Sequence, residues 1–407
     1  QGGGSHTAFT AGVLSQVFCP EVLDELDIVG LSGTSGGAIC ALVAWSALLQ
    51  GKPEEAGARL QRFWSANSAS LPMERLVNSM MMWGSRMTGS FTTPTFSPYD
   101  SFLSAWNKEH LRNLVRSVID FDELSKLATA PNAPLLLLGA VEVVTGELRT
   151  YSSRLGEITA DAVLASAAVA NMFRSISVHG GAYWDGFMSQ NPPVRDLMSS
   201  LPDEIWVVQV NPTSIDYEPT TVAEIANRRN ELAGNLALLQ ELNSMEVFDE
   251  LIDRGELKSD RLRPVTIRLL EMQQPPGSSR LGAASKLNRD PAFIRELIRH
   301  GKNQAADFLA STRFETLWRT RDVNGMSHYF ADDATISADV PGCRIERTSR
   351  RADVLRFVTE QLLEAARIAN ASSGSRRPGR FAFPEGCPII GGWPRRLSAT
   401  VESPTSR

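Results

Sequence analysis

The chain has 407 residues, of which 43% are hydrophobic and 21% charged, and its formal net charge is −5. This length allows one large domain with a smaller addition, and the composition is that of an ordinary soluble globular protein. The negative charge excludes a general attraction to nucleic acid or anionic lipid, so any membrane contact has to use a local apolar surface.

The chain opens on Gln1 and a run of three glycines, with no apolar run before them. Such glycines are typical of a turn between a strand and a helix, so we expect the chain to be truncated at its N-terminus. Residues 8–18 have the apolar spacing of a short helix, and residues 28–31 read as a buried strand. Residues 37–49 are apolar nearly all round, which predicts a core helix. They are too few to span a membrane, which takes about 20 residues.

Helix and strand patterns alternate through the middle of the chain. Helices are predicted at 54–64, 111–127, 159–170, 220–251 (one helix or two) and 291–310. A hairpin or a pair of strands is predicted at 134–151, a tight hairpin at 175–184, and strands at 205–210 and 265–269. Strands alternating with helices predict an α/β fold, with a sheet wrapped by helices.

The pattern changes near residue 313. Residues 1–312 are expected to form the main domain. Residues 313–370 weakly resemble the start of an NTF2-like or SnoaL-like fold. Either this domain is truncated or the likeness is accidental, and a real domain of this kind would aid association rather than catalysis. Residues 371–407 are rich in Ser, Arg, Pro and Gly, which predicts a disordered tail.

The four cysteines, Cys19, Cys40, Cys343 and Cys387, are far apart and show no CxxC pairing. This spacing argues against a disulfide framework or a zinc site and favours a reducing compartment. We therefore expect a cytoplasmic protein that meets membranes only peripherally. Cys40 lies in an apolar stretch and is interpreted as a buried small hydrophobe rather than a reactive thiol.

The segment Gly33-Thr34-Ser35-Gly36-Gly37 fits the pattern G-x-S-x-G. It lies between a predicted strand and a predicted helix, which is the context of a nucleophile elbow and makes Ser35 the candidate nucleophile. Gly33 and Gly37 leave room for the sharp turn, and the helix N-terminus favours developing negative charge. A Gly/Ser loop without chemistry stays open as the alternative.

Gly2, Gly3 and Gly4 form a side-chain-free turn that exposes several backbone N–H groups. Such a turn can cradle a phosphate or act as an oxyanion hole. The dinucleotide pattern GxGxxG is incomplete because Thr7 stands at its last glycine. With an elbow downstream the oxyanion hole fits better, and each donor there can contribute about 3 kcal/mol.

Asp185 follows an apolar run directly and is itself followed by Gly186. This placement directs a carboxylate from the end of a strand, as a catalytic base requires. The alternative is a plain Asp-Gly turn, which is common.

In this order, the glycine run, the elbow and the Asp-Gly strand end resemble the patatin-like phospholipase family of bacterial type. Four further stretches within residues 1–310 resemble bacterial members: 97–100, 165–168, 205–212 and 285–288. The resemblance implies a three-layer α/β sandwich with a central, mostly parallel sheet flanked by helices. It also implies a Ser-Asp dyad, with Ser35 attacking the acyl carbonyl and Asp185 accepting its proton and then activating water. Gly2, Gly3 and Gly4 would donate to the oxyanion, and no metal or organic cofactor would be needed.

The substrate expected from this resemblance is a lipid or fatty-acyl ester, with no nucleic acid involved and no particular oligomeric state implied. The chain departs from the family pattern at Thr7, at Phe187 beside the base, and at Ala170-Asn171. Two rivals therefore stay open: a short-chain esterase or thioesterase, and a catalytically silent lipid-binding protein.

Other candidate residues are less convincing. A Ser-Asp-His triad would need a histidine after Asp185, and His300 and His328 are both expected at the surface. His6 is expected to pack or cap locally. The run Met80-Met81-Met82-Trp83 could line an acyl channel or form a lid, but core packing is the favoured interpretation.

Overall fold

The computed structural model describes residues 1–320 except 89–96, 101, 171, 259–262 and 276–280, and after them residues 322, 325, 339–340 and 343–344. Contacts between residues divide the chain into two compact units, Gln1–Ala306 and Asp307–Arg407. The predicted tail 371–407 and most of the NTF2-like segment lie outside the described residues. Of that segment, the structure describes the end of one helix and two short strands, β8 (Asp339–Val340) and β9 (Cys343–Arg344).

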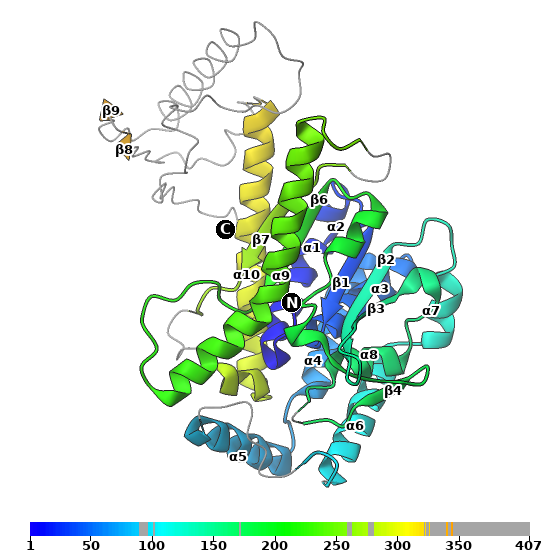
Figure 1. Cartoon of the computed structure of the whole chain (residues 1–407), viewed down its shortest axis with the longest axis vertical. Coiled ribbons are helices and arrows are strands. Elements are labelled where there is room, and N and C mark those ends of the chain that lie inside the picture. The colour runs from blue at the N-terminus through cyan, green and yellow to red at the C-terminus, as the bar shows by residue number, and fades with distance from the viewer. Residues whose placement is uncertain are drawn as a thin grey trace, which may run out of the picture. The chain divides into compact units, whose positions relative to one another are not determined.

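The main sheet is built around β2 (Leu135–Glu142), which begins with four buried leucines. Its neighbours are β1 (Gly30–Thr34), which runs parallel to it, and β3 (Leu148–Ser152) and β5 (Gly181–Asp185), which run antiparallel. The fifth strand, β4 (Ile176–Val178), pairs antiparallel with β5. Figure 1 shows this sheet inside a shell of helices.

The register on β2 brings two distant segments end to end. Because β3 occupies one edge of β2 from residue 137 to residue 141, β1 and β5 share the other edge. Thr34 at the end of β1 pairs with Gly139, and Asp185 at the end of β5 pairs with the next residue, Ala140. The two strands run in opposite directions, so their carboxyl ends meet at this point.

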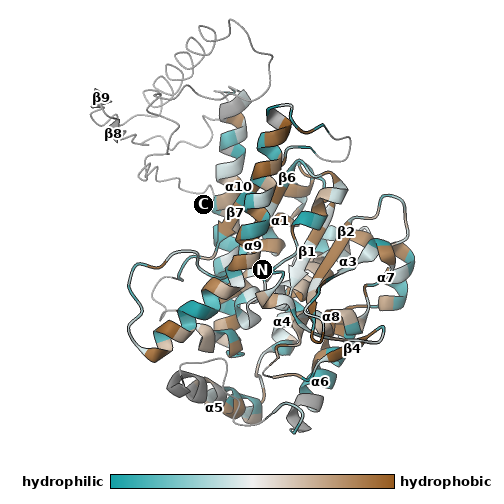
Figure 2. Ribbon diagram, in the orientation of Figure 1, coloured by the Kyte–Doolittle hydropathy of each residue, from teal (hydrophilic) through white to brown (hydrophobic). Residues whose placement is uncertain are grey.

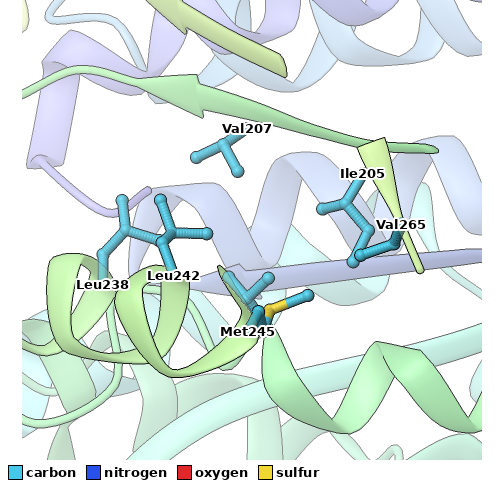
Figure 3. Packing of buried hydrophobic residues seen from close by; sticks show 7 residues of the cluster. Ile205, Val207, Leu238, Leu242, Met245 and Val265 are labelled. Atoms are coloured by element: carbon cyan, nitrogen blue, oxygen red, sulfur yellow. The ribbon is translucent and has the colours of Figure 1, made fainter. Parts of the chain in front are cut away.

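A second, two-stranded sheet joins β6 (Glu204–Gln209) and β7 (Thr266–Glu271) in parallel. The helix α9 (Val222–Asp253) packs its apolar side on these strands. Figure 3 shows the contact, whose buried residues are Val194, Ile205, Val207, Leu238, Leu242, Met245 and Val265.

The predicted α/β fold with a sheet flanked by helices is confirmed, but its mostly parallel character is wrong for the described strands. Only β1–β2 and β6–β7 pair in parallel there. The reason is local: β2–β3 and β4–β5 are joined by tight turns at Gly146 and Gly180, both with positive φ, and a short hairpin forces antiparallel pairing.

Helices cover the main sheet. The core helix α3 (Gly36–Leu49) is buried along most of its length and packs on β1 and β2. In Figure 2 the strand β2 is mostly apolar, whereas surface helices such as α6 alternate apolar and polar residues. The remaining helices of the first unit are η1 (Gly4–His6), α1 (Thr7–Val17), α2 (Pro20–Leu23), η2 (Pro53–Glu55), α4 (Ala56–Asn67), α5 (Pro72–Thr88), α6 (Phe102–Val118), α7 (Phe121–Leu127), η3 (Ser153–Leu155), α8 (Ala160–Ala167), η4 (Gly186–Met188), η5 (Arg195–Ser200) and η6 (Ala283–Leu287). The last long helix, α10 (Pro291–Thr320), has residues in both units. Within the described ranges, no helix combines the length and apolar composition that crossing a bilayer requires.

Candidate active site

Ser35 occupies a strained turn between β1 and α3. Its φ of 59° and ψ of −131° lie in a region that residues other than glycine rarely adopt. Such strained backbone conformations cluster at functional sites. The glycines on either side are required by close backbone contacts. A Cβ on Gly33 would lie 2.4 Å from the Gly37 carbonyl oxygen, and one on Gly37 would lie 2.4 Å from the Gln1 carbonyl oxygen. The segment that fits G-x-S-x-G therefore forms a tight turn between a strand and a helix, with Ser35 at the residue of positive φ.

The C-terminal end of α8 holds both candidate catalytic residues through their backbones. The Ser35 N–H donates to the Ser166 carbonyl oxygen at 3.0 Å, and the Asp185 N–H donates to the Ala168 carbonyl oxygen at 3.0 Å. The Ser166 hydroxyl, fully buried, donates to the Gly139 carbonyl oxygen on β2 at 2.7 Å. One helix end thus fixes the strand ends that the register of β2 brings together.

The Asp185 carboxyl is buried, and its pKa is raised. Its Oδ1 accepts a 2.9 Å hydrogen bond from the Phe187 N–H, while Oδ2 has no hydrogen-bond partner among the described residues. Burial raises the pKa of the Asp185 carboxyl to about 7, and the neighbouring Ser35 hydroxyl and the Phe187 N–H partly oppose that rise. A carboxyl that titrates near neutral pH beside a serine hydroxyl is suited to accept its proton.

The three glycines Gly2, Gly3 and Gly4, here called the glycine loop, lie directly against Ser35. A Cβ on Gly2 would be 2.7 Å from the Ser35 Cβ. The structure differs from the prediction at Gly2, because its N–H already donates to the buried Asn191 Oδ1 at 2.6 Å. The N–H groups of Gly3 and Gly4 have no acceptor within the described part of the chain. Gly36, as the first residue of α3, also presents an N–H without an intrahelical partner.

Two departures from the family pattern are accommodated locally. Thr7 donates its hydroxyl to the Gly4 carbonyl oxygen at 2.6 Å and lies so close to Gly36 that a Cβ there would be 2.1 Å from it. The Phe187 ring packs against Gly234 of α9, where a Cβ would lie 2.5 Å from the ring. A glycine on a distant helix thus provides the space for this aromatic side chain.

The described histidines near this region have structural contacts. His6 is buried, its Nε2 lies 2.7 Å from the Ser285 Oγ, and burial, followed by the charge of Lys286, lowers its pKa to about 3. His300 is buried, so its predicted surface position is wrong: its ring packs on Phe9 and its Nε2 lies 2.9 Å from the Gln273 carbonyl oxygen. His328 lies outside the described residues. Cys40 is buried as predicted, and burial raises its pKa to about 12.

The helix α5 turns an apolar face toward solvent. Met73, Leu76, Val77 and Met80 follow helical spacing and are between 48% and 70% exposed. On another side of the helix, Asn78 donates to Asn288 Oδ1 and accepts from the Arg289 N–H. Core packing, the favoured interpretation of the methionine run, is therefore wrong for Met80. The side chains at positions 81 and 83 lie outside the described ones.

Sequence reasoning missed several residues that support the site: Ser166, Asn191, Asn211 and Lys286. Ser166, Asn211 and Lys286 lie in stretches that resemble family members, but nothing in their sequence neighbourhoods indicates the contacts they make. Among the described residues, no group of three or more His, Cys, Asp or Glu side chains is arranged to hold a metal ion.

Part of the chain matches a known protein family. The family model described as Patatin-like phospholipase matches residues 1–198, a range that contains the glycine loop, Ser35 and Asp185. A search of curated proteins finds no match.

Proposed function

We propose, from the premise that residues 1–198 match the patatin-like phospholipase family, that this chain cleaves carboxylic esters of lipids with Ser35 as nucleophile and Asp185 as general base. The observation that carries the proposal is the meeting of β1 and β5 on adjacent residues of β2. That register places a strained serine beside a buried carboxyl of raised pKa.

In the acylation step, the Ser35 Oγ attacks the acyl carbonyl carbon while Asp185 takes the hydroxyl proton. The tetrahedral intermediate then collapses, the ester C–O bond breaks, and the departing alcohol takes the proton from Asp185. The acyl group is left as an ester on Ser35. The N–H groups of Gly3, Gly4 and Gly36 are the donors proposed for the oxyanion, since the Gly2 N–H is already engaged.

In the deacylation step, Asp185 takes a proton from water as the water oxygen attacks the acyl-enzyme. Collapse of the second intermediate releases the carboxylic acid and returns the proton to the Ser35 Oγ. The cycle consumes one water molecule and restores both residues.

Labelling with a fluorophosphonate probe tests this proposal directly. Wild type is expected to be labelled, Ser35→Ala to show no labelling, and Asp185→Asn to react at least about a hundredfold more slowly. The Asp196→Asn variant, at a partly exposed carboxylate paired with Arg195, is the matched control and should react like wild type. A folded wild type that does not react would refute the hydrolase proposal.

The exposed apolar face of α5 is proposed as the contact with aggregated lipid. Flexible methionine and leucine side chains suit a fluid hydrocarbon surface, and Asn78 joins this helix to the segment beside η6 that supports the glycine loop. In flotation with phosphatidylcholine vesicles, Ser35→Ala protein should bind, and adding Met73→Ser and Met80→Ser should weaken binding about tenfold or more.

The matched control replaces exposed apolar residues elsewhere, Val144→Ser and Leu155→Ser, and should leave vesicle binding unchanged. Equal binding by both double variants would exclude α5 as the lipid contact. Rates that fail to rise with acyl-chain length or with substrate aggregation would favour the short-chain esterase. Vesicle binding without serine labelling would favour the silent lipid-binding protein.

A further inference from the structure

Lys286 in η6 is a buried cation that the proposed reaction does not use. Its side chain is almost fully buried, and its Nζ donates to Asn211 Oδ1 and to Asn230 Oδ1, each at 2.7 Å. The same Nζ lies 4.8 Å from the centre of the Phe187 ring. The ammonium group is therefore held by two amide oxygens and an aromatic face, all of which require its positive charge or its N–H donors.

One side of Lys286 supports the glycine loop. A Cβ on Gly4 would lie 2.3 Å from the Lys286 carbonyl oxygen, so the two backbones are in direct contact. Asn211, which accepts from Lys286, donates through Nδ2 to the Gly2 carbonyl oxygen at 3.2 Å. The loop thus contacts Lys286 directly at Gly4 and through one amide at Gly2.

The other side of Lys286 reaches the base. Its ammonium group lies over the Phe187 ring, which is seated against Gly234, and the Phe187 N–H donates to Asp185 Oδ1 at 2.9 Å. A shift of this ring would move the backbone donor that orients the carboxylate.

We propose that Lys286 is a positioning residue that sets the glycine loop and the Asp185 carboxylate in register with each other around Ser35. This inference rests on the proposed function, because it assigns the loop and the carboxylate their catalytic roles. Burying a charge costs free energy, and an apolar side chain would fill the same space. The contacts of the ammonium group with Asn211 and with the Phe187 ring therefore explain why a lysine stands here.

The charged and titratable groups around Lys286 are Glu231 and Arg228 on α9 and His6 on η1. Glu231 is itself paired with Arg228 at 3.1 Å. Burial lowers the pKa of the Lys286 ammonium to about 8, opposed by the charge of Glu231. The ammonium form is present below that pH and is lost as pH rises through it. The contacts of Lys286 with Asn211 and with the Phe187 ring should therefore weaken above pH 8.

The test compares Lys286→Met and Lys286→Arg with wild type in fluorophosphonate labelling and in hydrolysis of p-nitrophenyl butyrate from pH 6 to pH 10. Lys286→Met is expected to lower the labelling rate and kcat about tenfold or more with little change in KM, because positioning acts on the transition state. Wild type should lose activity as pH rises through about 8. Lys286→Arg should retain most of the activity without that alkaline fall, since arginine does not titrate there.

Two further variants separate positioning from packing. Phe187→Leu keeps an apolar side chain against Gly234 but removes the ring face, and it should show an intermediate rate loss. Lys302→Met, at an exposed position of α10, should behave like wild type.

A folded Lys286→Met protein with wild-type rates and an unchanged pH profile would overturn the inference. If Lys286→Met does not fold, an unchanged alkaline fall in Lys286→Arg would overturn it equally. Wild type that is not labelled at all refutes the proposed function and this inference with it, whereas labelled wild type with insensitive Lys286 variants refutes this inference alone.

Discussion

Asp185, as the proposed base, should set the acid side of the pH dependence of the reaction. A base has to be ionised to accept the Ser35 proton, and burial raises the pKa of this carboxyl to about 7. The rate of fluorophosphonate labelling should therefore fall about tenfold for each pH unit below 7 and level off above it, until the alkaline fall expected from Lys286 near pH 8. A rate that is flat from pH 5 to pH 7 would exclude Asp185 as a base with this pKa.

The same burial predicts that Asp185 weakens the fold at neutral pH. The pKa is 3.8 for the ordinary carboxyl and about 7 in the folded protein, so the folded state binds more protons between these values. Stability contributed by the protonated form is thus lost as pH rises from about 4 to about 7. In urea unfolding, Asp185→Asn should gain up to about 4 kcal/mol relative to wild type at pH 8, and little at pH 4. A difference that is independent of pH would contradict this account.

How well a residue could be predicted depends on how local its cause is. Ser35 was predictable because the elbow needs only glycines at fixed offsets between a strand and a helix. The engagement of the Gly2 N–H by Asn191 depends on a residue far along the chain. The placement of Phe187 likewise depends on Gly234, a glycine within a helix whose purpose is invisible until the ring is seen against it.

Close backbone contacts hold α1, the helix that follows the glycine loop, against α10. Where α1 meets α10, a Cβ on Gly12 would lie 2.1 Å from the Ile298 carbonyl oxygen, and one on Gly301 would lie 2.1 Å from the Phe9 carbonyl oxygen. Gly12→Ala and Gly301→Ala should each cost about 2 kcal/mol or more of unfolding free energy, because backbone atoms cannot move aside as side chains can.

Lys302→Ala, at the exposed neighbour of Gly301, is the matched control in urea unfolding and should change stability by less than about 0.5 kcal/mol. Alanine variants at both glycines as stable as this control would show that the two helices separate at little cost.

Helices and strands could be predicted where the spacing of apolar residues determines them. The direction in which the strands pair could not be predicted in this way. The apolar runs around β1, β2 and β6 identify strands, but strand direction depends on connections, and the short turns at Gly146 and Gly180 make their pairs antiparallel. The predicted helix 111–127 is divided into α6 and α7 because the Asp120 side chain accepts from the N–H groups of Asp122 and Glu123 and begins a new helix.

The residues that support the site extend well beyond the family match. The match ends at residue 198, yet the glycine loop is held by Asn211 and Lys286, and Phe187 is seated on Gly234. The compact unit that contains all these contacts is Gln1–Ala306. The proposed catalytic residues therefore come from one part of this unit and much of their positioning from another.

This division predicts how truncated chains behave. A chain that ends after Thr320 keeps α10 whole and every contact described around Ser35, Asp185 and the glycine loop, so it should react with the fluorophosphonate probe at the wild-type rate. A chain that ends after Met198 keeps both proposed catalytic residues but lacks Asn211, Gly234 and Lys286. It also exposes the apolar surface that β6 and α9 cover. It should lose labelling and the cooperative thermal transition. Labelling of the shorter chain at a rate within about tenfold of wild type would mean that the matched segment forms the site unaided. In that case the contacts from the later strands and helices would serve stability alone.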